Sequence, residues 1–342
     1  MKLWVTCALL LLGGTGAVQA SQARPLVVTS SNAATNELLV YDASGQLLES
    51  VATGGAGGVS GNAGGIAVDG RTVAVVNFGS GTVSLLTRAA GGFAVKDVVP
   101  AASAPVSVAF GHDHLYVLGS STVESHRVER DGVAAAPDGV ATLLHADGSA
   151  AQVGVIADRL IITEKSNTVE TVELRGGAVT GAPANVELPA GSDTPLGLVT
   201  RGANAYVTIA HSDEVALVKH GQVVAITATG TPGGSGQHAP CWLALSGPYL
   251  YSANSPSHSL SRFVATGRHI ILEQPIAAQT IGAPTDITAG EDRVAVIDAS
   301  GSTARLTQFA ADGDGNLTQV AVTTIPAAAN GIGLVDRSAT KH

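Results

Sequence analysis

Side chains that could carry out chemistry stand at turns between apolar stretches of the sequence. Glu164 is followed directly by Lys165, and His238 begins the segment His-Ala-Pro-Cys-Trp that ends at Trp242. A glutamate or a histidine can act as a general acid or base, and a lysine can bind an anionic group of a substrate. We therefore take Glu164 and His238 as candidate catalytic residues and Lys165 as a candidate substrate contact.

Each of these residues also has a structural interpretation. Glu164 and Lys165 could form a surface ion pair. His238 and a further candidate substrate contact, His211, could be solvated loop residues, because neither belongs to a pair with the H-x-x-x-H spacing of metal ligands. Trp242 could stack on a substrate or fill the narrowing centre of the fold. We expect neither a metal nor a cofactor at this site.

Three amide side chains complete the candidate substrate-binding set. Gln152 stands at the start of an apolar stretch, whereas Asn77 and Asn254 precede turns rich in glycine and serine. An amide donates and accepts hydrogen bonds but does not shuttle a proton near neutral pH. Asn77 and Asn254 could equally satisfy the backbone of the turns that follow them.

A repeat of about 45 residues determines where these side chains lie. Each copy reads as a short apolar strand, a stronger apolar strand and a third alternating strand, with room for a fourth. Six copies begin at successive intervals of 42 to 45 residues, at Ala63, Pro105, Ala150, Pro195, Pro240 and Pro284. A period of roughly 40–50 residues with four strands is typical of a β-propeller blade.

The segments left over at the two ends add up to one more repeat. The N-terminal part offers strands at 26–30, 37–42 and 46–52, and the C-terminal part offers one at 331–335. The predicted fold is therefore an all-β, seven-bladed β-propeller with four-stranded antiparallel blades, whose last blade is closed by the N- and C-terminal strands. A pair of β-sandwiches or an open solenoid would not explain why the end pieces sum to one repeat.

Antiparallel pairing gathers the candidate residues at one place. The start of the innermost strand and the end of the second strand lie on the same face of a blade, because alternate strands reverse direction. We expect the candidate side chains around one mouth of a central channel. The glycine-rich segment 54–65 lacks the Gly-Lys-Ser/Thr ending of a phosphate-binding loop, so we expect a flexible connection between blades there.

The first twenty residues have the charge, apolar stretch and small-residue ending of a signal peptide cleaved after Ala20. We expect residues 21–342 to form a single domain in a periplasmic or secreted protein. Removal of Lys2 reduces the 18 basic residues to 17 against 27 acidic ones, so the net charge of −9 becomes −10. This balance argues against nucleic acid and anionic membrane surfaces as partners.

Two further features of the sequence limit the kinds of partner that we expect. No later apolar stretch is long and unbroken enough to span a membrane. Cys241 is the only cysteine that remains after removal of the signal peptide, so it cannot form a disulfide within the chain. We expect a monomer without membrane insertion that binds a small molecule or another exported protein.

Three segments resemble the lactonase-type seven-bladed propellers, the group that contains bacterial 6-phosphogluconolactonase and fungal carboxymuconate cyclase. They are NAGGIAVDGRTVAVVNFGSGTVSLLT, QVGVIADRLIITEKSNTVETVEL and HAPCWLALSGPYLYSANSPSHSLSRF. The likeness covers essentially the whole mature chain. It is most specific at Thr-Glu-Lys and Ala-Pro-Cys-Trp, which resemble an exported bacterial branch.

This resemblance implies a central-channel site for a sugar-derived or aromatic-derived lactone or carboxylate, worked by His, Glu and Arg side chains without a metal. The sequence departs from that pattern at Gln152, where the enzymes tend to have a histidine, and by the lack of arginine at the predicted mouth. Two hypotheses therefore stand. One is an exported hydrolase or isomerase acting on a lactone or carboxylated small molecule. The other is a non-catalytic propeller that binds a small ligand, a glycan or an exported protein.

Overall fold

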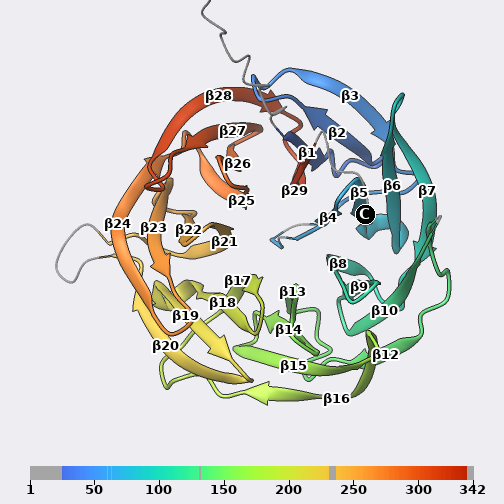
Figure 1. Cartoon of the computed structure of the whole chain (residues 1–342), viewed down its shortest axis with the longest axis horizontal. Helices are drawn as coiled ribbons and strands as arrows, with labels where there is room; N and C mark the ends of the chain where they lie inside the picture. Colours follow the sequence, from blue (N-terminus) through green and yellow to red (C-terminus); the bar gives the residue numbers. More distant parts are fainter. Residues whose placement is uncertain (1–24, 60, 63, 131, 231–235, 337–342) are drawn as a thin grey trace, which may run out of the picture.

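Seven antiparallel sheets stand in a ring around a central axis (Figure 1). This arrangement confirms the predicted seven-bladed β-propeller. The computed structural model describes residues 25–336 except 60, 63, 131 and 231–235. The predicted signal peptide, residues 1–20, lies outside the described residues. Within the described part of the chain, no helix has the length and apolar character needed to cross a membrane.

Each blade runs from an inner strand at the channel to an outer strand at the rim. Blade 1 contains β4 (Ile66–Asp69), β5 (Thr72–Asn77), β6 (Thr82–Ala89) and β7 (Gly92–Pro100). Blade 2 contains β8 (Pro105–Gly111), β9 (His114–Gly119), β10 (Thr122–Glu129) and a rim strand split into β11 (Gly132–Val133) and β12 (Gly139–Thr142). Blade 3 contains β13 (Ala150–Ile156), β14 (Arg159–Glu164), β15 (Thr168–Arg175) and β16 (Ala178–Val186).

The next three blades repeat this order. Blade 4 contains β17 (Pro195–Arg201), β18 (Asn204–Ile209), β19 (Glu214–Lys219) and β20 (Gln222–Ala228). Blade 5 contains β21 (Pro240–Ser246), β22 (Tyr249–Asn254), β23 (Ser259–Ala265) and β24 (Ile270–Gln279). Blade 6 contains β25 (Ala283–Ala289), β26 (Arg293–Ser300), β27 (Thr303–Ala311) and β28 (Leu317–Ile325). Short 3-10 helices, η1 (Phe78–Ser80) and η2 (Ala210–Ser212), join the second and third strands of blades 1 and 4.

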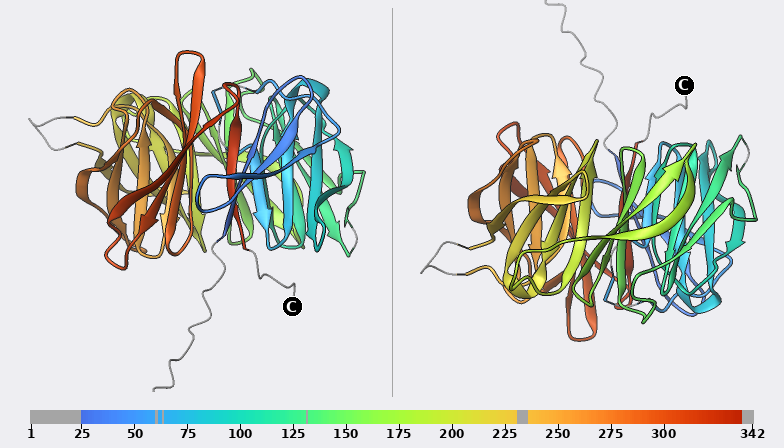
Figure 2. Two further views of the ribbon diagram at one scale, coloured as in Figure 1. Left: turned by 90° about the horizontal axis from the view of Figure 1, so that it is seen from above. Right: turned by 90° about the horizontal axis from the view of Figure 1, so that it is seen from below.

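Blade 7 closes the ring with strands from both ends of the chain. Its strand order is β29 (Asn330–Val335), β1 (Leu26–Ser30), β2 (Glu37–Tyr41) and β3 (Leu47–Ala52). β29 pairs antiparallel with β1, with Leu26 opposite Val335. The predicted closure is confirmed, and both ends of the described chain lie on the same face of the ring (Figure 2).

The burial of the second strands explains why the repeat can be recognised in the sequence. All six residues of β9 are buried, because the second strand of a blade is covered on both faces by neighbouring blades. The rim strand β7 is instead mostly exposed, and only Phe93 and Val99 are buried in it. A nearly continuous apolar run therefore marks the second strand of each blade.

A bulge at the start of the inner strand directs side chains toward the channel. The pairing register shifts between Ala150 and Gln152 and between Pro240 and Trp242, and similar shifts open β8, β17 and β25. The extra residue re-aims the side chain that follows it. Gln152 follows such a bulge, and its side-chain amide lies next to Gly64, just before β4.

Candidate functional site

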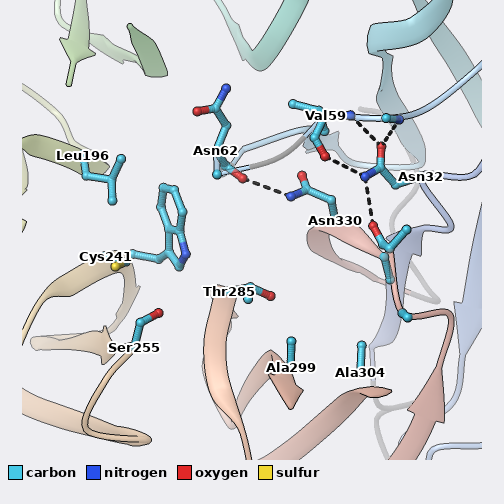
Figure 3. Close-up of a pocket in the computed structure, with 16 residues that line it drawn as sticks. Asn32, Val59, Asn62, Leu196, Cys241, Ser255, Thr285, Ala299, Ala304 and Asn330 are labelled. Atoms are coloured by element: carbon cyan, nitrogen blue, oxygen red, sulfur yellow. Dashed lines mark hydrogen bonds between the residues drawn. The ribbon is translucent and has the colours of Figure 1, made fainter. Parts of the chain in front are cut away.

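A cavity of about 550 Å³ lies at the mouth of the channel where the inner strands begin (Figure 3). Its lining comes from the first residues of β17, β21, β25 and β29, from the β26–β27 hairpin and from the start of the loop after β22. The segment 327–329 completes it, together with Asn32, Gly58, Val59, Gly61 and Asn62. The volume falls in the range of roughly 300–1,000 Å³ that is common for small-molecule sites. The inner-strand starts therefore build a pocket of ligand size at the predicted mouth.

One wall of the cavity is apolar and aromatic. It contains Leu196, Cys241 and Trp242. Trp242 is 5% exposed, and its indole N–H has no hydrogen-bond partner among the described residues. The thiol of Cys241 donates to the backbone oxygen of Ala239 (3.3 Å), and burial raises the pKa of this thiol. This wall offers a flat ring and one free N–H donor.

The opposite wall consists of asparagine side chains. Asn32, in a left-handed conformation (φ 53°), accepts from the backbone N–H groups of Gly58 (2.6 Å) and Val59 (3.0 Å). Its amide nitrogen donates to the backbone oxygens of Val59 (2.7 Å) and Ala328 (2.9 Å). Asn32 thus joins the glycine-rich segment to the turn before β29. These bonds hold Gly58 and Val59, which belong to the segment predicted as a flexible connection between blades, against the cavity.

Asn62 and Asn330 extend this wall along the mouth of the cavity. Asn330 donates to the backbone oxygen of Asn62 (3.1 Å), and Lys165 donates through Nζ to the side-chain oxygen of Asn62 (2.8 Å). The amide nitrogen of Asn62 has no partner among the described residues, and Oδ1 of Asn330 is buried without one. The amide nitrogen of Asn62 therefore retains hydrogen-bonding capacity toward a ligand, whereas Oδ1 of Asn330 is closed off from the cavity.

Lys165 reaches the mouth from blade 3, as predicted for a residue at the end of a second strand. Its ammonium group bonds to Asn62, a residue that lines the cavity, although Lys165 itself does not. Burial lowers the pKa of Lys165. Structurally, the lysine holds the cavity wall, and direct contact with a substrate stays a prediction.

Glu164 points away from the cavity and into the junction between blades 2 and 3. Its side chain is fully buried, and Oε1 accepts from the backbone N–H of His145 (3.2 Å). Glu170 lies beside it on β15 and accepts from the N–H of Leu144 (2.9 Å). Burial raises the pKa of both carboxyl groups, that of Glu170 to about 7. The two acids hold the connection between the blades, and the catalytic role of Glu164 stays a prediction.

His211 and His238 lie outside the cavity, in the turn after β18 of blade 4 and in the segment before β21 of blade 5. Both side chains are 64% exposed. His238 Nδ1 is 2.7 Å from Oδ2 of Asp213, and Asp213 accepts from the N–H of Ala239 with its other oxygen (2.7 Å). His211 Nδ1 is 3.0 Å from the hydroxyl of Thr194. A carboxylate therefore orients the ring of His238.

The three other predicted substrate contacts, Asn77, Asn254 and Gln152, form hydrogen bonds within the fold. The buried side chain of Asn77 bonds to four neighbours, Asn36, Thr53, Thr82 and Ser84. Asn254 bonds in the same way to Ser252, Ser259 and Ser261. The side-chain oxygen of Gln152 accepts from the backbone N–H of Leu198 (2.7 Å), which links blade 3 to blade 4. None of the three lines the mouth cavity.

Asp286, which was not among the candidates from the sequence, is a buried acid on the innermost strand of blade 6. Its Oδ1 accepts from the N–H of Ile287 (2.8 Å), while Oδ2 has no hydrogen-bond partner in the described chain. Burial raises the pKa of Asp286 to about 7, and longer contacts with the N–H groups of Gly64, Gly331 and Ile332 oppose this rise. Asp286 takes the same place in its repeat as Gln152 and Trp242, so aligning the bulges would have identified it.

The chemistry of the cavity is that of neutral hydrogen bonding. No Asp, Glu, Lys, Arg or His is among the residues that line it. The described residues contain no group of three or more His, Cys, Asp or Glu side chains arranged to hold a metal ion. The site can bind a ring against Trp242 and bond to hydroxyl or carbonyl groups, but its lining has no group that commonly transfers a proton at neutral pH.

Comparison with known proteins identifies similar folds but no close relative. No protein-family model matches the chain, and no curated protein sequence matches it significantly. A solved protein from Lactobacillus plantarum matches with a TM-score of 0.68 and 19% identity over 91% of this chain and 99% of its own.

Two further solved structures are described as candidate 6-phosphogluconolactonases. The protein from Bacteroides fragilis matches with a TM-score of 0.67 and 15% identity over 93% of this chain and 99% of its own. The protein from Bacteroides uniformis matches with a TM-score of 0.66 and 16% identity over 91% and 100%. The predicted likeness to lactonase-type propellers is thus confirmed for the fold.

Proposed function

We propose that this propeller binds a neutral, hydroxylated ring compound of the sugar or sugar-lactone class in the mouth cavity. The observation that carries the proposal is the pairing of a tryptophan with the free amide nitrogen of Asn62 in a cavity whose described lining residues are uncharged. An aromatic face packs against the C–H groups of a sugar ring, and amides bond to its hydroxyls. The ring is either a free molecule or the terminal unit of a glycan.

Charge argues against a phosphorylated lactone in this cavity. A phosphate ester carries up to two negative charges near neutral pH, and its burial requires cationic partners or several N–H donors. Lys165 is bonded to the lining, but its ammonium group is already engaged by Asn62. A neutral lactone or sugar fits the available donors and acceptors better.

Binding can be measured through Trp242, because the other tryptophan of the chain, Trp4, belongs to the proposed signal peptide. We expect saccharides or aldonolactones from a panel to change the fluorescence of Trp242 and to slow the alkylation of Cys241. Asn62→Asp should weaken binding about tenfold through loss of an N–H donor. Asn185→Asp on the rim strand β16 is the matched control and should have no effect. A panel without any response would refute the proposal.

Lactone hydrolysis is a second candidate, and the orientation of His238 by Asp213 favours it. An imidazole fixed by a carboxylate is the usual arrangement of a general base. Turnover of a lactone that is lost in His238→Gln and kept in Glu164→Gln would assign the reaction to His238. Turnover that is lost in Glu164→Gln and kept in His238→Gln would assign it to Glu164. Absence of turnover on all lactones would indicate a binding protein without this activity.

We also propose that the protein acts as a monomer in the periplasm or outside the cell. The proposal is supported by the signal-like features of residues 1–20 and by the acidic net charge. N-terminal sequencing of protein recovered from an export-competent host should begin at Ser21. A protein that retains Met1 and remains in the cytoplasmic fraction would contradict it.

A further inference from the structure

One end of the mouth cavity is lined by alanine side chains. Ala299 and Ala304, which pair with each other across β26 and β27, belong to this lining together with the alanines at 327–329. Thr285 lies between Ala299 and the amide of Asn62 (Figure 3). We call Ala299, Ala304 and residues 327–329 the alanine end of the cavity. Their methyl groups offer a ligand apolar contact and no side-chain hydrogen bond.

The hydroxyl groups of the lining are already engaged within the protein. The hydroxyl of Thr285 donates to a backbone oxygen of β26 (3.3 Å), and the hydroxyl of Ser255 donates to a backbone oxygen of β25. Among the described lining residues, the side-chain N–H groups without a partner are those of Asn62 and Trp242, and Trp242 is 5% exposed. The free side-chain donors therefore belong to other walls than the alanine end.

The cavity is larger than a single sugar ring. At the roughly 30 Å³ that a water molecule occupies in the liquid, about 550 Å³ holds about eighteen non-hydrogen atoms, and a hexose has about twelve. A second sugar ring in the remaining space would leave hydroxyls without partners against the alanine methyl groups. The charged neighbours Asp298 and Arg305 pair with each other (3.4 Å), and neither lines the cavity. The remaining space therefore favours uncharged, apolar atoms.

We propose that the ligand of the mouth cavity is a sugar or sugar lactone with a short, uncharged alkyl or acyl substituent that lies against Ala299 and Ala304. This inference rests on the proposed function, because it requires the sugar ring to bind at Trp242 and Asn62. Ala304 is buried, whereas Ala328 in the same lining is exposed. A longer chain would leave the cavity into solvent, so affinity should rise with the first few carbons and then level off.

A series of alkyl glycosides tests the proposal on the whole mature chain, with the fluorescence of Trp242 as the measurement. The probes are methyl, butyl and hexyl glycosides of glucose, galactose and mannose. Each fully buried methylene strengthens binding about fourfold, so the three methylenes that butyl adds to methyl, if half-buried, should strengthen it about eightfold. The step from butyl to hexyl should be smaller than the step from methyl to butyl.

A variant that fills the alanine end locates the substituent. Ala299→Leu places additional apolar atoms in this space and should reduce the ratio of butyl to methyl affinity from about eightfold to less than twofold. Ala184→Leu, on the exposed face of the rim strand β16, is the matched control and should preserve the ratio. Circular dichroism would verify that both variants are folded. The glycoside series on the unaltered protein tests the proposal without any variant.

The outcomes separate this inference from the proposed function. Equal affinities for methyl and butyl glycosides, or tighter binding of a disaccharide than of every butyl glycoside, would overturn the inference and keep the sugar site. An unchanged affinity ratio in a folded Ala299→Leu variant would also overturn it. If no sugar, lactone or glycoside binds to the unaltered protein, both the proposed function and this inference are wrong.

Discussion

Replacing Asp286 by asparagine should remove a large part of the pH dependence of stability. Burial raises the pKa of this carboxyl to about 7 in the folded protein, whereas its ordinary value is 3.8. Between these values the unfolded chain loses a proton that the folded protein keeps. The contribution of Asp286 to stability is therefore fully present below the unfolded pKa and is lost as the pH rises through the folded pKa.

The magnitude follows from the size of the shift. About three pKa units at roughly 1.4 kcal/mol each correspond to about 4 kcal/mol, and the part lost between pH 5 and pH 8 is about 2–3 kcal/mol. Asparagine has the same shape and no titrating proton, so Asp286→Asn should lack this component. Because Glu170 titrates in the same range, the difference between variant and unaltered protein is the informative quantity.

Urea unfolding at pH 5, 6, 7 and 8, followed by circular dichroism, measures this difference. We expect the stability of Asp286→Asn relative to the unaltered protein to increase by about 2–3 kcal/mol from pH 5 to pH 8. Any constant effect of the amide cancels in this comparison. Parallel pH profiles of the two proteins would refute the reasoning, since they would mean that Asp286 is already ionised at pH 5.

Three further predictions concern the contacts between blades. Glu170→Gln should also flatten the loss of stability between pH 5 and pH 8, because burial raises the pKa of Glu170 to about 7; an unchanged slope in urea unfolding would contradict this. Asn77→Ala should cost about 2–4 kcal/mol through loss of four buried hydrogen bonds, whereas a melting temperature within 2 °C of the original would argue against this role. A chain that ends at Ala329 lacks β29 and should fail to give a cooperative melting transition in calorimetry, and retention of that transition would show that ring closure is dispensable.

The blades could be predicted from the sequence because burial imposes its own pattern. The strands expected at 26–30 and 331–335 differ from β1 and β29 by at most one residue at either end. Second strands covered on both faces need apolar residues at most positions, and the turns between them need glycine, asparagine or aspartate. These requirements are local, so the repeat preserves them. The split rim strand of blade 2 depends instead on contacts of His126 with Ala134 and of Ser125 with Asp138.

The site was less predictable because it depends on which way single side chains turn. Glu164 and Lys165 are neighbours in sequence, yet one is buried between blades and the other bonds to Asn62 across the mouth. Adjacent residues at a strand end point to different sides, and packing with the next blade decides which side is the cavity. The approach of Asn32 and Asn62 to the cavity arises from contacts distant in sequence. The sequence repeat therefore does not predict these contacts.

The seam between β1 and β29 also determines how the protein responds to tension on its ends. Leu26 lies opposite Val335, so a force that separates the two ends acts on the same end of an antiparallel pair. Hydrogen bonds across the seam would then break one after another, from Leu26 toward Ser30, rather than together as in shear. We therefore expect the closed ring to open at this seam under a smaller pulling force than shear of the same strand pair would need.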